Sequence, residues 1–373
     1  MEFVLDVTDA DGAGWRGQLR RPDGSVSTLR LQPPPGTPRP AVHDGLVVAI
    51  LPAAMRTGGT LRVRGALTRG ALRNLTEYAE AWANWGPDRF HHVTLAPDAI
   101  VDGHAPASGH DAVFAWSGSL RSTHTLVRHR DGLVPGAFGV RAALRVEGLR
   151  PGDDTSERVR QALAPDGVPL LTVRTNAAAA GFVDPEIGAL PIVAGALHLV
   201  GAGATAGFHA RSWSFAAQMR YPRPGPALQD LLSGDGFTVR ADGGATSPPR
   251  MAADVLRHPS LAAGLSDCHR VPRAAAPCGR CGDCTLTALA FAALGAPPPH
   301  GRRVRRWRVA ALALVDPVRA ADAAATLADW PPDDSTLRAA LATRTALGRV
   351  ATDLRDTARW FGSAAGLRAP WPR

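Results

Sequence analysis

Four cysteines lie within seventeen positions of the 373-residue chain, and the chain has no others. They are Cys268, Cys278, Cys281 and Cys284, spaced C-x9-C-x2-C-x2-C. A C-x2-C turn presents two sulfurs to one metal ion, and zinc prefers four thiolates in a tetrahedral arrangement. Disulfides fit this spacing poorly, while an iron–sulfur or redox role and unliganded thiols remain alternatives. We expect one structural zinc site, whose closed shell leaves no position for a substrate.

The basic residues are all arginine, because the 42 Lys and Arg residues include no lysine, and the formal net charge is +9. The absence of lysine excludes a Schiff base, a lysine nucleophile and a Walker-type GK[ST] loop. One dense basic segment, GRRVRRWR from Gly301 to Arg308, includes Trp307. It could contact the phosphates of RNA or form a solvated face, so an RNA or protein partner and a homodimer stay open.

Turn signals and apolar runs divide the chain into three expected units. Residues 1–110 form an N-terminal β-rich and α/β unit, with hairpin turns at Asp11-Gly12 and Asp23-Gly24. Residues 111–300 hold the main α/β domain with the four-cysteine site, and residues 301–373 form a helical C-terminal extension. Connectors are expected at 33–40 and 97–111. The N-terminus has no secretory leader pattern and no apolar run spans a bilayer, so we expect a cytoplasmic protein without membrane contact.

Strand and helix patterns alternate through most of the chain. The expected strands are 3–7, 17–20, 27–31, 61–63, 91–95, 112–116, 143–146, 169–173 and 236–239, with one more near Gly207. The expected helices are 67–85, 123–129, 156–163, 251–256, 285–294, 317–328 and 335–361. Such alternation predicts an α/β fold with a doubly wound, mostly parallel sheet covered on both faces.

The segment from Phe114 to Thr123 reads FAWSGSLRST. It resembles the strand, loop and helix start of the PP-loop ATP pyrophosphatases, whose signature is SGGxDS. The cysteine segment resembles that of the 7-cyano-7-deazaguanine synthase-like members of that superfamily, which carry similarly spaced cysteines C-terminal to the loop. The similarity spans roughly residues 46–295 and implies an adenine nucleotide alpha hydrolase-like fold.

This resemblance implies that the loop holds the pyrophosphate end of ATP. A substrate carboxylate is then adenylated, and ammonia or another nucleophile displaces AMP to form an amide or a nitrile. The substrates would be a nucleotide and a carboxylate-bearing small molecule or macromolecule, and use of Mg²⁺ stays open. A strand that ends in a Ser/Gly turn before a helix suits phosphate, because backbone N–H groups and the helix dipole face the anion. The expected nucleotide-binding residues are Ser117, Gly118, Ser119, Arg121, Ser122, Thr123, Thr175, Asn176 and Asp242.

Two departures fall inside the loop signature. Ser119 stands where the second glycine is expected, and Arg121 stands where the family has an aspartate that helps to hold Mg²⁺. Arginine would repel the metal and bind phosphate or carboxylate oxygens directly, so we take Arg121 as the candidate catalytic residue. Further along, only Pro249-Arg250 represents the family's Ser-Arg-x-x-Lys pattern, and Leu286 replaces an arginine. An ATP-dependent C–N ligase and a catalytically degenerate scaffold or accessory subunit are therefore both open.

Simpler roles compete for several of these residues. Ser122 and Thr123 could cap the following helix, and Asp242 could serve only its Asp-Gly-Gly turn. Thr175 and Asn176 follow an expected strand at the carboxyl edge of the sheet, where open α/β sheets bind ligands. His124, close to the loop, is a weaker acid–base candidate, because a lone histidine is more often a packed side chain.

Overall fold

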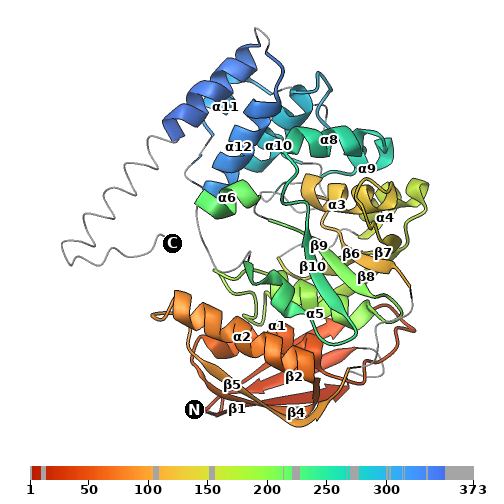
Figure 1. Cartoon of the computed structure of the whole chain (residues 1–373), viewed down its shortest axis with the longest axis vertical. Helices are drawn as coiled ribbons and strands as arrows, with labels where there is room; N and C mark the ends of the chain where they lie inside the picture. The colour runs from red at the N-terminus through yellow and green to blue at the C-terminus, as the bar shows by residue number, and fades with distance from the viewer. Residues whose placement is uncertain are drawn as a thin grey trace, which may run out of the picture.

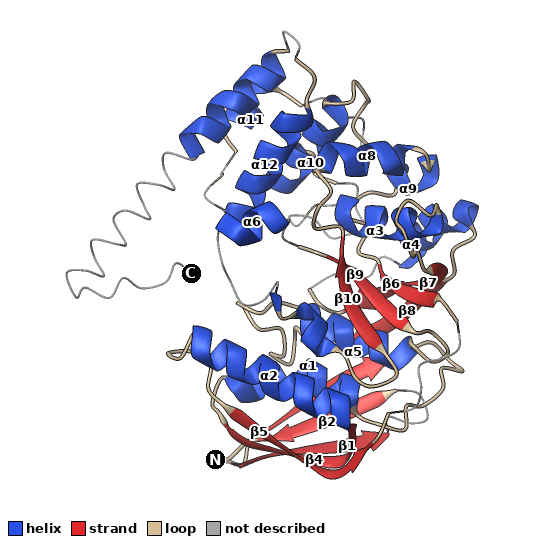
Figure 2. Ribbon diagram, viewed as in Figure 1, coloured by secondary structure: helices blue, strands red, loops and turns tan. Residues whose placement is uncertain are grey.

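The computed structural model describes residues 2–9, 14–103, 109–150, 156–212, 214–220, 227–266, 268, 277–299, 301, 304–312, 314, 316–332 and 335–348. Its strands form one sheet in the order β10-β9-β6-β7-β8-β3-β2-β1-β4-β5 (Figures 1 and 2). Six of the nine neighbouring pairs run parallel. The prediction of an α/β fold with a mostly parallel sheet is confirmed.

The N-terminal half of the sheet mixes strand directions. Its strands are β1 (Glu2–Asp9), β2 (Trp15–Arg20), β3 (Val26–Gln32), β4 (Gly59–Thr68) and β5 (Val93–Val101). The first three pair as antiparallel hairpins, while β4 lies parallel to both β1 and β5. The Asp23-Gly24 turn is confirmed by a 2.8 Å hydrogen bond from Arg21 N to Ser25 O. The Asp11-Gly12 turn lies outside the described residues, and β5 extends into the connector expected from residue 97.

Helices α1 (Asp44–Met55) and α2 (Arg69–Trp85) cover this half of the sheet. The helix expected at 67–85 from a stripe of apolar residues is confirmed as α2, whose buried residues include Leu75 and Trp82. Nearly every side chain of α1 is buried, so its sequence lacks a polar face. For a helix buried on all sides, apolar periodicity is a poor guide, because the stripe disappears.

Helix α5 (Leu190–Val200) packs directly on α1, and no helix was expected there. Gly45 of α1 and Gly195 of α5 face each other so closely that a Cβ on Gly195 would lie 2.4 Å from the Gly45 carbonyl oxygen. Glycine at both positions therefore allows the two backbones to touch. This contact fixes α5 against the sheet beside the candidate site.

The C-terminal half of the sheet is wholly parallel within itself. Its strands are β6 (Asp111–Ala115), β7 (Gly139–Glu147), β8 (Leu170–Thr175), β9 (Ala206–Ala210) and β10 (Thr238–Asp242). Counted along the chain, their spatial order is 3-2-1-4-5. In such sheets the connections leave in opposite directions from the first and fourth strands, here β6 and β9. Ligands bind in the crevice at the carboxyl ends of that pair.

Both faces of this half are covered. Alternate residues of β6 separate the two sides: Val113 packs in the core that includes α5, whereas Phe114 packs with α3 (Leu120–Arg130) and α4 (Ser156–Leu163). Alternation of side chains across a strand produces this division. The expected doubly wound arrangement is therefore seen in the five parallel strands.

The two halves of the sheet meet at β3 and β8, which pair antiparallel over Leu31 with Thr175 and Gln32 with Arg174. Asn176 strengthens this short junction. Its amide oxygen accepts from Arg30 N at 2.8 Å, and its amide nitrogen donates to Thr28 O at 2.8 Å. The division into units 1–110, 111–300 and 301–373 stays a prediction.

The rest of the chain is mainly helical. Its elements are η1 (Ala164–Asp166), α6 (Phe215–Arg220), η2 (Gln229–Leu232), α8 (Pro248–Leu256), α9 (Pro259–Ala263), α10 (Gly282–Ala292), α11 (Arg306–Ala310) and α12 (Pro317–Asp329). Residues 336–348 are also helical, and the remainder of the expected last helix lies outside the described residues. Helices α10, α11 and α12 share an apolar cluster with this stretch (Figure 1). Within the described ranges, none of the helices combines the length and apolar character that a bilayer crossing requires.

Candidate functional site

The loop between β6 and α3 carries the partial PP-loop signature. Gly118 has φ 78°, a left-handed conformation that glycine adopts without strain. Ser119 is the N-cap of α3, and its hydroxyl accepts a hydrogen bond from Ser122 N at 3.2 Å. The capping role considered for Ser122 and Thr123 therefore belongs to Ser119. The 11-residue helix directs its unpaired N–H groups toward this loop.

Three serine hydroxyls converge at this helix start. The Oγ atoms of Ser117 and Ser119 are 3.0 Å apart, those of Ser117 and Ser122 3.1 Å, and those of Ser119 and Ser122 3.0 Å. Each hydroxyl has a single hydrogen to donate, and rotation about its C–O bond can redirect that hydrogen. The triangle thus offers donors to an oxyanion without movement of the backbone.

The loop opens into a cavity of about 660 Å³. The strands β6, β7 and β9 contribute Ala115, Leu144 and Ala210 from their carboxyl ends. The other walls include the segment before α5, the start of α5, and parts of α8, α10 and α12. The cavity therefore lies at the switch point between β6 and β9, where doubly wound sheets bind ligands.

Arginine dominates the charge of the cavity. Arg121, in the first turn of α3, forms an ion pair with Asp322 of α12, and each side chain is 17% exposed. Arg145 of β7 is 2% exposed and donates to Ser117 O at 3.3 Å. Arg150 also contributes to the lining. A buried arginine that touches the loop raises the positive potential where an anion would bind.

Each carboxylate of the cavity lining has an arginine partner. Arg319 Nε lies 2.9 Å from Asp283 Oδ1, and Arg56 Nε lies 2.6 Å from Asp184 Oδ2. Asp322, the third carboxylate of the lining, pairs with Arg121. No lining carboxylate of the described chain is thus left without a cation, which disfavours a ready-made Mg²⁺ site of the family type.

His209 lies at the carboxyl end of β9 and lines the same cavity. It is 5% exposed, and burial is the main cause that lowers its pKa to about 4. The imidazole is therefore neutral at pH 7. Its Nδ1 lies 3.2 Å from Ala210 O, while Nε2 is buried with no hydrogen-bond partner among the described residues.

Other expected nucleotide-binding residues do not line this cavity. The Thr123 hydroxyl accepts from Trp116 Nε1 at 3.0 Å, and the Thr175 hydroxyl accepts from Ala177 N at 3.1 Å. Asn176 belongs to the sheet junction, and Gly118 shapes the loop backbone rather than the wall. In the described structure, these residues stabilise the backbone and side chains around the site and do not face the cavity.

Asp242, at the end of β10, and His124, in α3, do not line the cavity and instead pair with neighbouring side chains. Asp242 pairs with Arg128 at 3.2 Å and His129 at 3.7 Å. Burial opposes the shift, but the contact with His129 and the charge of Arg128 lower the pKa of Asp242. His124 lies 3.1 Å from Asp254 of α8, and burial lowers its pKa to about 4. Both pairs hold α3 against its neighbours.

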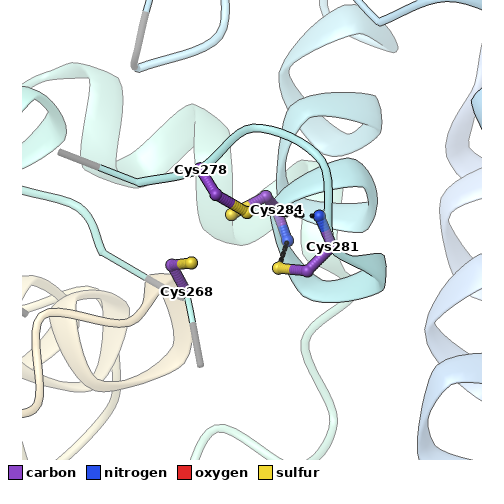
Figure 3. Close-up of side chains that lie close together, drawn as sticks. All are labelled: Cys268, Cys278, Cys281 and Cys284. Atoms are coloured by element: carbon purple, nitrogen blue, oxygen red, sulfur yellow. Dashed lines mark hydrogen bonds between the residues drawn. The ribbon is translucent and has the colours of Figure 1, made fainter. Parts of the chain in front are cut away.

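The cysteines converge as the spacing predicts. The four sulfur atoms lie within 4.8 Å of one another, and Cys268, Cys281 and Cys284 are buried (Figure 3). Sulfurs around a tetrahedral zinc are about 3.8 Å apart, given a Zn–S bond of about 2.3 Å. The cluster is therefore close enough to hold a metal ion such as zinc.

Hydrogen bonds within the loop orient the sulfurs and favour a thiolate at Cys281. Cys278 Sγ accepts from Arg280 N and Cys281 N, each at 3.3 Å, and Cys281 is the N-cap of α10. A hydrogen bond from the Cys284 thiol is the main cause that lowers the pKa of Cys281 to about 4 and raises the pKa of Cys284. A metal replaces the proton that this pair would share.

The metal loop lies between the cavity and the basic segment. Asp283, between Cys281 and Cys284, lines the cavity. On the other side, Arg308 Nη1 donates to Gly279 O at 2.5 Å, and the Arg308 guanidinium lies 5.1 Å from the ring centroid of Trp307, which is 60% exposed. Residues 302 and 303 of the basic segment lie outside the described residues, and an RNA contact there stays a prediction.

Sequence reasoning missed three parts of the cavity. Asp322 comes from the C-terminal extension, and no local pattern connects it to Arg121 across 201 positions. Arg145 and His209 gave a usable signal, because each interrupts an apolar run that becomes a buried strand. A charged or titratable residue inside such a run needs a partner or a function.

Comparison with protein-family models gives no match, and comparison with curated proteins gives no similar protein. The resemblance to PP-loop enzymes therefore depends on the loop and cysteine motifs themselves.

Proposed function

We propose that this protein binds ATP or a related nucleotide in the cavity at the carboxyl edge of β6, β7 and β9. The single observation that carries the proposal is the triangle of Ser117, Ser119 and Ser122 hydroxyls at the start of α3. It combines hydroxyl donors, the helix dipole and the buried Arg145 at the switch point of a doubly wound sheet. This arrangement suits the phosphates of a nucleotide.

The cavity has room beyond the phosphates. A volume of about 660 Å³ is within the usual range for small-molecule sites. Leu149, Val183, Leu190 and Val193 supply apolar wall on the side of α5, suited to a planar base or an apolar substrate. The polar loop thus suits the phosphates of a nucleotide, and the apolar wall suits its base.

The resemblance to 7-cyano-7-deazaguanine synthase-like proteins supports a specific reaction. A carboxylate oxygen of the substrate attacks the α-phosphorus of ATP, and pyrophosphate leaves with the electrons of the broken P–O bond. Ammonia or another amine then attacks the acyl carbon, AMP departs, and the amine loses one proton to give an amide. Arg121 would stabilise charge on the transferring groups, as an arginine fork binds phosphate and carboxylate oxygens.

Zinc would serve the fold in this proposal. Four thiolates close the coordination shell, so the metal has no open position for substrate. The loop it ties down places Asp283 and the start of α10 in the cavity wall. Loss of the metal would therefore disturb the cavity without removing a reacting group.

The reaction is tested by measuring AMP and pyrophosphate released from ATP and Mg²⁺ in the presence of a panel of carboxylates. Ser122→Ala should lower the rate because it removes one corner of the hydroxyl triangle. Ser260→Ala is the matched control, because Ser260 bonds Asp166 outside the cavity. A carboxylate-dependent rate that falls only in Ser122→Ala is the expected result. Equal rates in both variants would contradict the proposal.

The Arg121–Asp322 pair favours a second candidate, a scaffold or accessory subunit that keeps the fold without ATP pyrophosphatase activity. The family's Mg²⁺-binding aspartate is absent at position 121, and the lining carboxylates of the described structure are all paired. ATP binding without AMP formation for any carboxylate would select this candidate over the enzyme.

A further inference from the structure

Asp322, the partner of Arg121, comes from helix α12, which is far from the loop in sequence. Helix α12 contributes Val318, Arg319 and Asp322 to the cavity lining, so it forms part of the wall. Arg121 and Asp322 both line the cavity and are paired there. The chain thus places one of its own carboxylates on a cation that faces the expected anionic ligand.

The guanidinium of Arg121 is only partly used by this pair. Asp322 Oδ1 accepts from Nη2, whereas Nη1 is buried and has no hydrogen-bond partner among the described residues. An arginine fork binds a carboxylate or phosphate best through two parallel hydrogen bonds. The single contact leaves a donor that a better-placed oxyanion would use.

The charged form of Asp322 is costly to keep next to Arg121. Burial is the main cause that raises the pKa of Asp322, and the charge and hydrogen bond of Arg121 oppose that rise without cancelling it. Because desolvation makes the charged form of this half-buried carboxylate costly, an anion that brings more hydrogen bonds would compete with it for Arg121. The serine triangle next to Arg121 would supply those additional bonds to a ligand.

We propose that Arg121 is an anion subsite of the cavity and that Asp322 occupies it as an intramolecular stand-in for a ligand phosphate or carboxylate. Ligand binding then exchanges the Asp322 contact for a ligand contact and releases one attachment of α12. This inference rests on the proposed nucleotide site. It also gives the C-terminal extension a role, because its carboxylate competes with the ligand.

Two explanations of the same ion pair predict opposite effects. If Asp322 only positions Arg121 for the ligand, removal of its charge weakens anion binding. If Asp322 competes, removal strengthens binding, because a larger fraction of the protein presents a free subsite. The sign of the change in affinity therefore separates the two.

The test measures the affinity of inorganic pyrophosphate, without added metal, by isothermal titration calorimetry. For Asp322→Asn we expect a dissociation constant about three- to tenfold lower than that of the native protein, the range for loss of one partly buried competing ion pair. Asp283→Asn is the matched control, because Asp283 also lines the cavity and pairs with an arginine. It reports the gain from removing a carboxylate from another arginine of the lining, Arg319, which should be smaller because the inferred subsite is at Arg121. Zinc content is measured for both variants.

The double variant Arg121→Gln/Asp322→Asn should lose the gain. An unchanged or weaker affinity in Asp322→Asn, or a gain of equal size in Asp283→Asn, would overturn the inference. Binding of ATP by the native protein alongside such a result leaves the proposed function intact. Absence of ATP and pyrophosphate binding in every protein would overturn both.

Amide hydrogen exchange of the native protein tests, without any mutation, whether a ligand displaces Asp322 from Arg121. Pyrophosphate should increase amide exchange in α12 (Pro317–Asp329), because it displaces the Asp322 contact, and decrease exchange in the first turn of α3. Slower exchange in α12 would show that the ligand reinforces the Asp322 contact, against the inference. This measurement decides the matter even if Asp322→Asn fails to fold.

Discussion

Ser119 combines two roles at a single hydroxyl. It caps α3 by accepting from Ser122 N, and it forms one corner of the hydroxyl triangle. The PP-loop signature that this loop resembles has glycine at this position. A serine therefore adds a cap and a donor where that signature leaves open backbone.

Ser119→Ala should lower the free energy of unfolding by about 1 kcal/mol, the usual effect of losing an N-cap. Ser119→Gly should lower it by only about a few tenths of a kcal/mol, because glycine is an acceptable N-cap residue. Urea denaturation of the three proteins measures both. Equal stability of the alanine and glycine variants would show that the hydroxyl does not cap the helix.

His209 makes a prediction for acid conditions. Its folded-state pKa of about 4 lies below the ordinary histidine value of 6.5, so between these pH values the unfolded chain binds more protons than the folded protein. Stability is therefore lost as pH falls from about 6.5 to about 4, by up to about 3 kcal/mol for this group. His209→Gln should show a shallower loss of unfolding free energy over that interval. Parallel pH profiles of the two proteins would contradict the assigned burial of a neutral imidazole.

At the scale of elements, the cysteine loop and α10 form one unit. Cys281 caps the helix, and Cys284 lies in its first turn, so a bound metal would tie the helix start to Cys268 in the preceding segment. Arg319 of α12 then contacts Asp283 of the same turn. Metal binding at the loop would in this way stabilise the cavity wall.

We expect about one zinc per chain, and strong chelation should unfold the α10 region, because structural zinc contributes directly to folding. Cys268→Ser should reduce zinc content and the melting temperature together. Elemental analysis and circular dichroism measure the two quantities. A fully folded, metal-free protein with an unchanged melting temperature would contradict a structural role.

The elements themselves were predictable to different degrees. Strands of the parallel half are short apolar runs between turn signals, and all five are close to the expected positions. Amphipathic α2 was predicted from its stripe, whereas α5 was missed because it is apolar on nearly every side. A buried helix and a buried strand have the same local pattern, and only the packing of α5 on α1 distinguishes them.

The residues of the candidate site were also predictable from the sequence to different degrees. Ser117, Ser119, Arg121 and Ser122 are contiguous, so one loop motif predicted them and the structure brings them to the cavity. Asp322 reaches the cavity through the packing of α12 on α10, α8 and α6, which no spacing in the sequence encodes. Thr175 and Asn176 lie at a carboxyl strand end as expected, but that strand lies at the junction of the two half-sheets.

At the scale of the whole molecule, a two-residue pairing between β3 and β8 joins the half-sheets, and the Asn176 amide adds two hydrogen bonds across it. Asn176→Ala should lower the free energy of unfolding by about 1–3 kcal/mol, the range for two such bonds. Its affinity for ATP should be unchanged, because Asn176 does not line the cavity. Gln161→Ala, which removes an exposed amide from α4, serves as the control in denaturation. A selective loss of ATP affinity in Asn176→Ala would place this residue in the site after all.

The cavity, the hydroxyl triangle and the arginine-rich wall together support one central claim, that the carboxyl edge of the parallel half-sheet is a nucleotide site. Because every lining carboxylate of the described structure is paired with an arginine, none of these carboxylates is available to hold a divalent metal beside the phosphates. Nucleotide affinity should then persist without a divalent metal.

Isothermal titration of ATP into the zinc-loaded protein checks this, once with added Mg²⁺ and once in a buffer passed over a chelating resin beforehand so that it contains no Mg²⁺. A nucleotide site at this edge of the sheet should give saturable binding of one ATP per chain under both conditions. Ser122→Ala should weaken the affinity about tenfold or more, because it removes one charge-assisted hydrogen bond. Ser260→Ala should bind as the native protein does. No measurable binding, or binding that Ser122→Ala leaves unchanged, would contradict the account.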